Sequence, residues 1–143
     1  MTSTTTTPTP SLYFSPQPTR SARARWAFLE AKRPFDGHPI DIFAGEHKTP
    51  DYLSVNELGL VPAATFDGDV IIESSALALI ATLGSELMPQ AGTADWRRAL
   101  QWVVFAPAEL DHARERLRGL RRPVFPRRQE RPFAAMAAGS AAR

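Results

Sequence analysis

Cysteine is absent from this chain of 143 residues, and long apolar runs are absent too. Without cysteine there is no disulfide framework, no CxxC redox site and no cysteine-ligated zinc, which excludes dithiol redox catalysis. No apolar run approaches the roughly 20 residues of a membrane helix, and the start lacks the basic and apolar stretches of a signal peptide. We therefore expect a cytoplasmic protein without a membrane segment. The three histidines are scattered, so we expect no metal site.

The net charge of +2 hides an uneven distribution. Residues 1–116 carry 10 Lys and Arg against 14 Asp and Glu, whereas residues 117–143 carry 7 against 1. Clustered cations bind phosphates without sequence preference, as a nucleic-acid partner would require. The basic segment has no interleaved aromatic residues beyond Phe125 and Phe133, so nucleic acid is the least favoured partner.

The first half of the chain alternates strands and helices. Residues 1–10, rich in Thr and Pro, have almost nothing apolar to bury and are expected to be a disordered leader. Four elements are then expected: a strand at 12–14, a helix at 19–32 with Ala22, Trp26 and Leu29 at helical spacing, a strand at 40–43 and a weak helical turn at 51–56.

A hairpin is the clearest local signal in the sequence. The runs 63–66 and 70–72 flank an Asp67-Gly68 turn, the residue pair that two-residue hairpin turns favour. A helix then opens at 73–75 and ends near Gly84, with apolar residues at helical spacing, namely Ala76, Leu79, Ile80, Leu83 and Leu87. The order β-α-β followed by β-β-α predicts an α/β fold with one parallel pair and one antiparallel hairpin.

A further helix is expected from Thr93 to residue 117. Trp96, Leu100, Val103 and Val104 would share one face of it. Pro107 should kink or end this helix, because proline lacks the backbone N–H that the helix needs. The basic tail, residues 118–143, has no sustained apolar period, and we expect it to pack poorly.

Four stretches resemble the N-terminal, thioredoxin-like domain of cytosolic glutathione transferases of the serine-type theta- or zeta-like classes. They are 12–27 (LYFSPQPTRSARARWA), 45–50 (GEHKTP), 56–63 (NELGLVPA) and 72–77 (IESSAL). The resemblance implies that residues 11–89 form this domain and that residues 93–117 are the first helix of an all-helical domain that is otherwise missing. The basic tail would then be what a frameshift leaves.

The resemblance implies that glutathione is the co-substrate, and elementary chemistry says what such a site must do. The thiol of glutathione has a pKa near 8.5, so only a few per cent is thiolate at neutral pH. A hydroxyl donor at a helix start would raise that fraction. Ser15, Thr19 and Ser21 are the candidates, with Ser15 first and Thr19 close behind. The alternative for each of them is a purely structural role as a helix cap.

The same resemblance implies roles for the remaining candidates. Pro62, if its peptide bond is cis, would present the Val61 backbone to the cysteinyl part of glutathione. Glu73 and Ser74 would bind the γ-glutamyl end at a helix start, an anion site by nature. The loop cations His47 and Lys48 would hold the glycine carboxylate.

Two functions follow from these expectations. The first is a glutathione transferase that delivers the thiolate to a small electrophile, with a homodimer and a role in detoxification as further expectations. The alternative is a non-catalytic thioredoxin-like module that binds glutathione, an enzyme remnant. The family's usual proline and cation are replaced here by Glu57 and Leu60, and losing the cation weakens the expected anchoring of the tripeptide.

Overall fold

The computed structural model describes residues 9–120, and for 115 and 118–120 only the backbone. The leader predicted at 1–10 and the tail predicted at 118–143 therefore lie almost entirely outside the described residues. The elements, in chain order, are β1 (Ser11–Phe14), α1 (Ser21–Glu30), β2 (Asp36–Pro39), the 3-10 turn η1 (Glu46–Lys48), α2 (Pro50–Val55), β3 (Ala63–Phe66), β4 (Asp69–Ile72), α3 (Ser74–Thr82), α4 (Ala94–Phe105), the π-helical turn η2 (Ala106–Leu110) and α5 (Asp111–Leu120).

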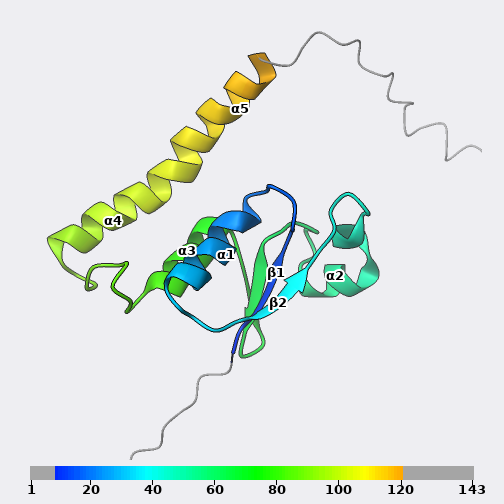
Figure 1. The fold of residues 1–143 in the computed structure, drawn as a ribbon, viewed down its shortest axis with the longest axis horizontal. Helices are drawn as coiled ribbons and strands as arrows, with labels where there is room; N and C mark the ends of the chain where they lie inside the picture. Colours follow the sequence, from blue (N-terminus) through cyan, green and yellow to red (C-terminus); the bar gives the residue numbers. More distant parts are fainter. Residues whose placement is uncertain (1–8, 121–143) are drawn as a thin grey trace, which may run out of the picture.

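One four-stranded sheet organises the fold, in the order β2-β1-β3-β4. β1 pairs parallel with β2 through the α1 crossover, and it pairs antiparallel with β3, which forms the hairpin with β4. Helices α1 and α3 lie together on one side of the sheet and α2 lies on the other (Figure 1). The predicted α/β class and its β-α-β, β-β-α order are confirmed.

The hairpin turn forms as its residues require. Asp67 and Gly68 both have positive φ, 51° and 94°, the backbone of the turn that matches the twist of the flanking strands. Glycine adopts this conformation freely and aspartate tolerates it. The predicted hairpin therefore forms, with Phe66 paired with Asp69 across the turn.

The second strand was predicted at 40–43, and this prediction is wrong. The strand is β2, whose four residues are all exposed and include Pro39. Pairing with β1 fixes its position, since the Asp36 N–H bonds the Pro10 carbonyl and the Ile40 N–H bonds the Phe14 carbonyl, both at 2.8 Å. An edge strand accepts proline because its outer N–H groups need no partner.

The core lies between the sheet and the pair α1 and α3. Leu12 and Phe28 are 0% and 1% exposed, and Phe28 packs edge-on against Phe35 with ring centroids 5.4 Å apart. Small side chains let the two helices approach closely. The remaining buried apolar residues of this cluster are Ala24, Ala27, Ala64, Leu77 and Ala81.

Helical spacing predicted the wrong apolar faces. Trp26 and Leu29 are 63% and 54% exposed, whereas the buried face of α1 carries Ala24, Ala27 and Phe28. In α3 the buried residues are Ser74, Leu77 and Ala81, and the predicted Leu87 lies beyond the helix end. The close contact of α1 with α3 selects small side chains for the interface, which a hydrophobicity pattern does not reveal.

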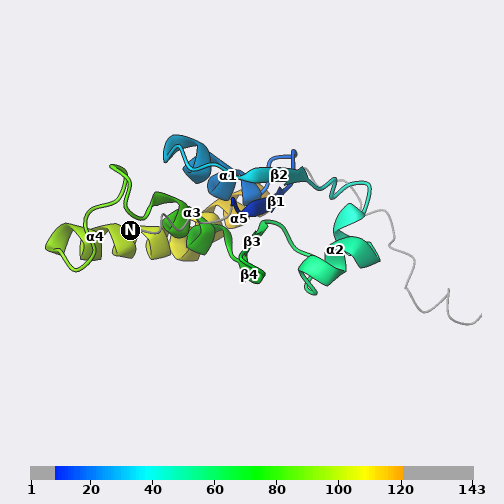
Figure 2. The ribbon, with the colours of Figure 1, turned by 90° about the horizontal axis from the view of Figure 1, so that it is seen from below.

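The C-terminal helices form one long rod beside the sheet domain. α4 ends at Phe105, two residues before Pro107, and the wide turn η2 accommodates the proline before α5 begins (Figures 1 and 2). Proline has no N–H to donate to a carbonyl one turn earlier, and the wider turn of a π-helix accommodates this missing hydrogen bond. The rod therefore continues past Pro107, with the α-helix interrupted there.

Replacing Phe28 with alanine should lower the free energy of unfolding by about 3–5 kcal/mol, because a fully buried aromatic side chain leaves a cavity. Leu29→Ala, on the exposed side of the same helix, is the matched control and should change it by less than about 0.5 kcal/mol. Urea unfolding followed by circular dichroism measures both. Equal losses in the two variants would contradict the assigned face of α1.

Candidate functional site

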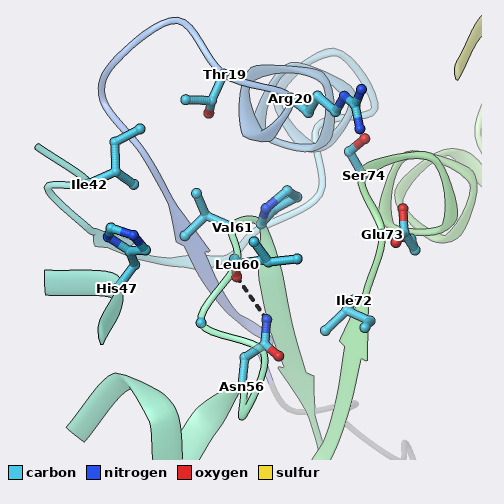
Figure 3. A pocket seen from close by; sticks show the side chains of 12 residues that line it. Thr19, Arg20, Ile42, His47, Asn56, Leu60, Val61, Ile72, Glu73 and Ser74 are labelled. Carbon is cyan, nitrogen blue, oxygen red and sulfur yellow. Dashed lines mark hydrogen bonds between the residues drawn. The ribbon is translucent and has the colours of Figure 1, made fainter. Parts of the chain in front are cut away.

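A cavity of about 340 Å³ opens where the start of α1, the loop before β3 and the first turn of α3 meet (Figure 3). Its volume is within the range of small-molecule sites. Six of the residues named from the sequence line it: Thr19, His47, Val61, Pro62, Glu73 and Ser74. The other lining residues are Arg20, Ile42, Asn56, Gly59, Leu60 and Ile72.

The three candidate hydroxyls differ in their access to this cavity. Ser15 and Ser21 are 4% and 0% exposed and do not line it. Ser21 Oγ accepts a hydrogen bond from the Ser15 N–H at 2.9 Å, and Ser15 Oγ donates to Gln17 Oε1. Thr19 lies on the cavity wall with its Oγ1 2.6 Å from Ser21 Oγ. The two serines thus brace the loop that presents Thr19.

Asp41 ties the same loop to the segment after β2. Its Oδ1 accepts hydrogen bonds from Gln17 Nε2 at 3.0 Å and from the backbone N–H groups of Phe43 and Ala44 at 2.9 and 3.1 Å. The backbone bonds, with Ala44 first, hold the pKa of Asp41 below its ordinary value. These bonds form a turn at residues 41–44, where a strand was predicted at 40–43.

The loop before β3 contains a cis peptide bond between Val61 and Pro62. The Leu60 carbonyl accepts hydrogen bonds from Asn56 Nδ2 at 2.8 Å and from the Tyr52 hydroxyl at 2.6 Å. Burial raises the pKa of Tyr52 to about 12, so this hydroxyl stays protonated and donates throughout the physiological range. These two bonds hold the loop directly before Val61.

His47 and Lys48 lie on η1 but are placed differently. His47 lines the cavity, and its buried Nδ1 has no hydrogen-bond partner within residues 9–120. Lys48 does not line it, and its Nζ donates to the Leu58 carbonyl at 3.0 Å. Gly59 packs against this turn with φ of 58°, where an added Cβ would lie 2.6 Å from the His47 carbonyl oxygen. Only glycine fits there.

The first turn of α3 forms the far wall of the cavity. Glu73 precedes the helix with φ 77° and ψ 116°, a backbone conformation that residues other than glycine rarely adopt. Within the described part of the chain no side chain caps this helix. Its first N–H groups therefore have no side-chain cap, and together with the helix dipole they favour an anion at this end of the cavity.

Arg23 joins this helix start to the C-terminal rod. Its Nη1 donates to Ser74 Oγ at 3.0 Å and to Ser75 Oγ at 3.3 Å, and its Nη2 bonds Asp111 Oδ2 at 2.9 Å. This bond lowers the pKa of Asp111, with a smaller contribution from Arg20, whose Nε lies 3.7 Å from the same oxygen. Ser74 Oγ accepts the hydrogen bond from Arg23, so the hydroxyl hydrogen of Ser74 is available to donate to an acceptor in the cavity.

Sequence reasoning missed several residues that build the site. Arg23, Gln17 and Asp111 act through partners up to 88 positions away in the chain. Nothing in the local pattern separates Arg23 from Arg25, the other arginine of α1. Asn56 offered a signal, because asparagine at a helix end often bonds the following backbone.

The sheet order, the cis-proline loop before β3 and the helix after the hairpin are features of a thioredoxin-like fold. Residues 19–81 match the family described as "Glutathione S-transferase, N-terminal domain". Over these residues the chain is therefore similar to the N-terminal domain of glutathione S-transferases.

Individual relatives agree. The chain is 31% identical over 88 residues to glutathione S-transferase 3 of Zea mays, a match that takes in 58% of this chain and 40% of that protein. The solved structure of a possible glutathione S-transferase from Rhodopseudomonas palustris is 30% identical with a TM-score of 0.65, over 73% of this chain and 54% of that one. A glutathione transferase homologue from Sulfitobacter, solved with bound glutathione, is 26% identical with a TM-score of 0.64, over 82% and 58%. The chain thus spans about half the length of its relatives.

The described residues contain neither a metal-binding group nor a membrane-spanning helix. Among residues 9–120, no group of three or more His, Cys, Asp or Glu side chains is placed to hold a metal ion. In the same range, no helix is long and apolar enough to cross a membrane.

Replacing Glu73 with glycine should raise the free energy of unfolding by about 1 kcal/mol, because the strained backbone of this position suits glycine. Glu57→Gly is the control, an exposed glutamate whose φ is not positive, and it should lower stability by up to about 1 kcal/mol. Urea unfolding at neutral pH measures both. A loss of stability in Glu73→Gly would show that the conformation carries no strain.

Proposed function

We propose that the cavity binds glutathione and activates its thiol for transfer to a small electrophile. The observation that supports this proposal best is the convergence of Thr19, the Val61 backbone and Ser74 on one cavity from three separate segments (Figure 3). The Sulfitobacter homologue with bound glutathione supports the same ligand for this fold.

In this proposal the γ-glutamyl end lies at α3. Its carboxylate accepts from the Ser74 hydroxyl and from the first N–H groups of the helix, which is how helix starts bind anions. The Glu73 carboxylate, exposed at the same point, pairs with the ammonium group. The strained backbone of Glu73 is then the cost of placing that carboxylate beside the helix start.

The rest of the tripeptide follows the cavity toward η1. The backbone N–H and C=O of Val61 pair with the cysteinyl residue, since Val61 lines the cavity and precedes β3, outside the strand pairing that begins at Ala63. The glycine carboxylate then lies near His47, whose Nδ1 lacks a partner among the described residues. Lys48 bonds the Leu58 carbonyl, and in this proposal it acts on the glycine carboxylate from a longer range.

Thr19 is the proposed activating hydroxyl. When Ser21 Oγ donates to Thr19 Oγ1 across their 2.6 Å contact, the hydrogen of Thr19 is left to bond the sulfur. A hydrogen bond to the thiolate lowers the thiol pKa, and the positive end of α1 acts in the same direction. Ser15 and Ser21 would then support Thr19 and not touch the sulfur.

The electrophile, the homodimer and the cytoplasmic location are further parts of the proposal. Glutathione reacts only in its reduced, thiol-bearing form, which the reducing cytoplasm maintains. The non-catalytic alternative predicts retention on immobilised glutathione without turnover of a chromogenic electrophile, and light scattering decides the oligomeric state. The arginine-rich tail, which underlies the nucleic-acid alternative, lies mostly outside the described residues.

Removing the hydroxyl in Thr19→Ala should lower kcat on the order of 100-fold, as loss of one oriented donor does in other active sites. Thr19→Ser, which keeps the hydroxyl, should retain most of the activity. Steady-state turnover of a chromogenic electrophile at saturating glutathione is the measurement. Full activity in Thr19→Ala, together with a loss in Ser15→Ala at unchanged stability, would assign the role to Ser15 instead.

A further inference from the structure

The two sides of the proposed glutathione cavity differ in their chemistry. On the side of α1 and α3, the lining residues Arg20 and Glu73 carry charged side chains. Ile42 and His47 lie across the cavity from Glu73, with Leu60 between the two sides (Figure 3). The side near η1, where the glycine residue of the tripeptide is proposed to lie, is therefore largely apolar.

Leu60 stands where the third residue of the tripeptide is expected. It directly precedes Val61, the residue proposed to pair with the cysteinyl backbone. On its other side, Gly59 packs against η1 so closely that an added Cβ would lie 2.6 Å from the His47 carbonyl oxygen. The Leu60 side chain is 59% exposed and lines the cavity, so an incoming ligand can contact it.

The polar groups at this end are few or already bonded. Asn56 donates from Nδ2 to the Leu60 carbonyl at 2.8 Å and accepts at Oδ1 from the Leu58 N–H at 3.2 Å. Lys48 is exposed, and its Nζ bonds the Leu58 carbonyl and does not line the cavity. Among the described side chains that line the η1 end, His47 is the one that can ionise.

A free carboxylate gains little from such a surrounding. Its charge loses part of its hydration against Ile42 and Leu60, and no lysine or arginine that lines this end compensates the loss within the described residues. An amide or ester carbonyl oxygen accepts a hydrogen bond from the imidazole of His47 as a carboxylate oxygen does, without the cost of a charge. An alkyl group on that ester would also be removed from water against Leu60.

We propose that the cavity accepts thiol tripeptides whose third residue is neutral at its carboxyl end, namely amides and small alkyl esters of glutathione, at least as well as glutathione itself. Leu60 is the specificity-determining residue, because a cation at this position would favour the carboxylate. This inference rests on the proposed glutathione function and adds a class of thiol co-substrate to it. The γ-glutamyl and cysteinyl parts are the same in all these ligands, so their proposed contacts are unchanged.

Calorimetry of the full chain with three ligands tests this inference. The ligands are S-methylglutathione, its glycinamide and its glycyl ethyl ester, in which the S-methyl group prevents oxidation of the thiol. The amide differs from the acid in charge at almost equal size, and the ester adds an apolar group. We expect the amide to bind within about twofold of the acid, and the ester about three- to fivefold more tightly than the amide, the effect of burying about one methylene.

Leu60→Lys should raise the preference for the acid over the amide about three- to fivefold, the range of one exposed charge pair. Leu58→Lys is the matched control, since Leu58 is 52% exposed on the same loop and does not line the cavity. It adds the same net charge and should leave the preference unchanged. Both positions are exposed, so both variants should unfold in urea close to the wild type.

Three results would overturn the inference while the glutathione site stands. They are an acid that binds the wild type more than fivefold more tightly than the amide, an ester that binds no more tightly than the amide, and equal preferences in Leu60→Lys and Leu58→Lys. Failure of all three ligands to bind the wild-type chain would instead overturn the proposed function.

Discussion

Arg23 makes the contact on which the arrangement of the site depends. One guanidinium, on the helix that follows Thr19, bonds Ser74 at the start of α3 and Asp111 on α5. Both bonds involve a charged group and are therefore stronger than neutral hydrogen bonds. The cavity has Thr19, just before α1, on one wall and Ser74 on another, and the Arg23 contact ties α1 to the start of α3 between them.

Local chemistry explains which parts of the fold could be predicted. The Asp67-Gly68 turn and the helix after it are specified by residues that are neighbours in the sequence. The second strand was misplaced because apolar residues at 40–43 suggested burial, while backbone pairing with β1 set the true position. The buried faces of α1 and α3 were missed because close helix contact, a tertiary demand, selected alanine over Trp26.

The residues of the site also divide into those that the sequence predicts and those whose placement depends on tertiary contacts. Val61, Pro62, Glu73 and Ser74 were predicted from the family resemblance, and the structure brings them to one cavity. The choice among Ser15, Thr19 and Ser21 stayed open because all three hydroxyls lie near one helix start. Only burial separates them, and burial depends on how the loop folds over α1. The roles of these residues in binding remain predictions.

The central claim, that the chain binds glutathione as the thiolate, is tested most directly by titrating the ultraviolet thiolate absorbance of glutathione against pH with the protein in excess. The chain has no cysteine, so every thiolate signal belongs to the ligand, and burial raises the pKa of Tyr52 to about 12, away from the thiol. We expect the midpoint to fall well below the value of about 8.5 for a free thiol. A midpoint that the protein leaves unchanged would contradict the account.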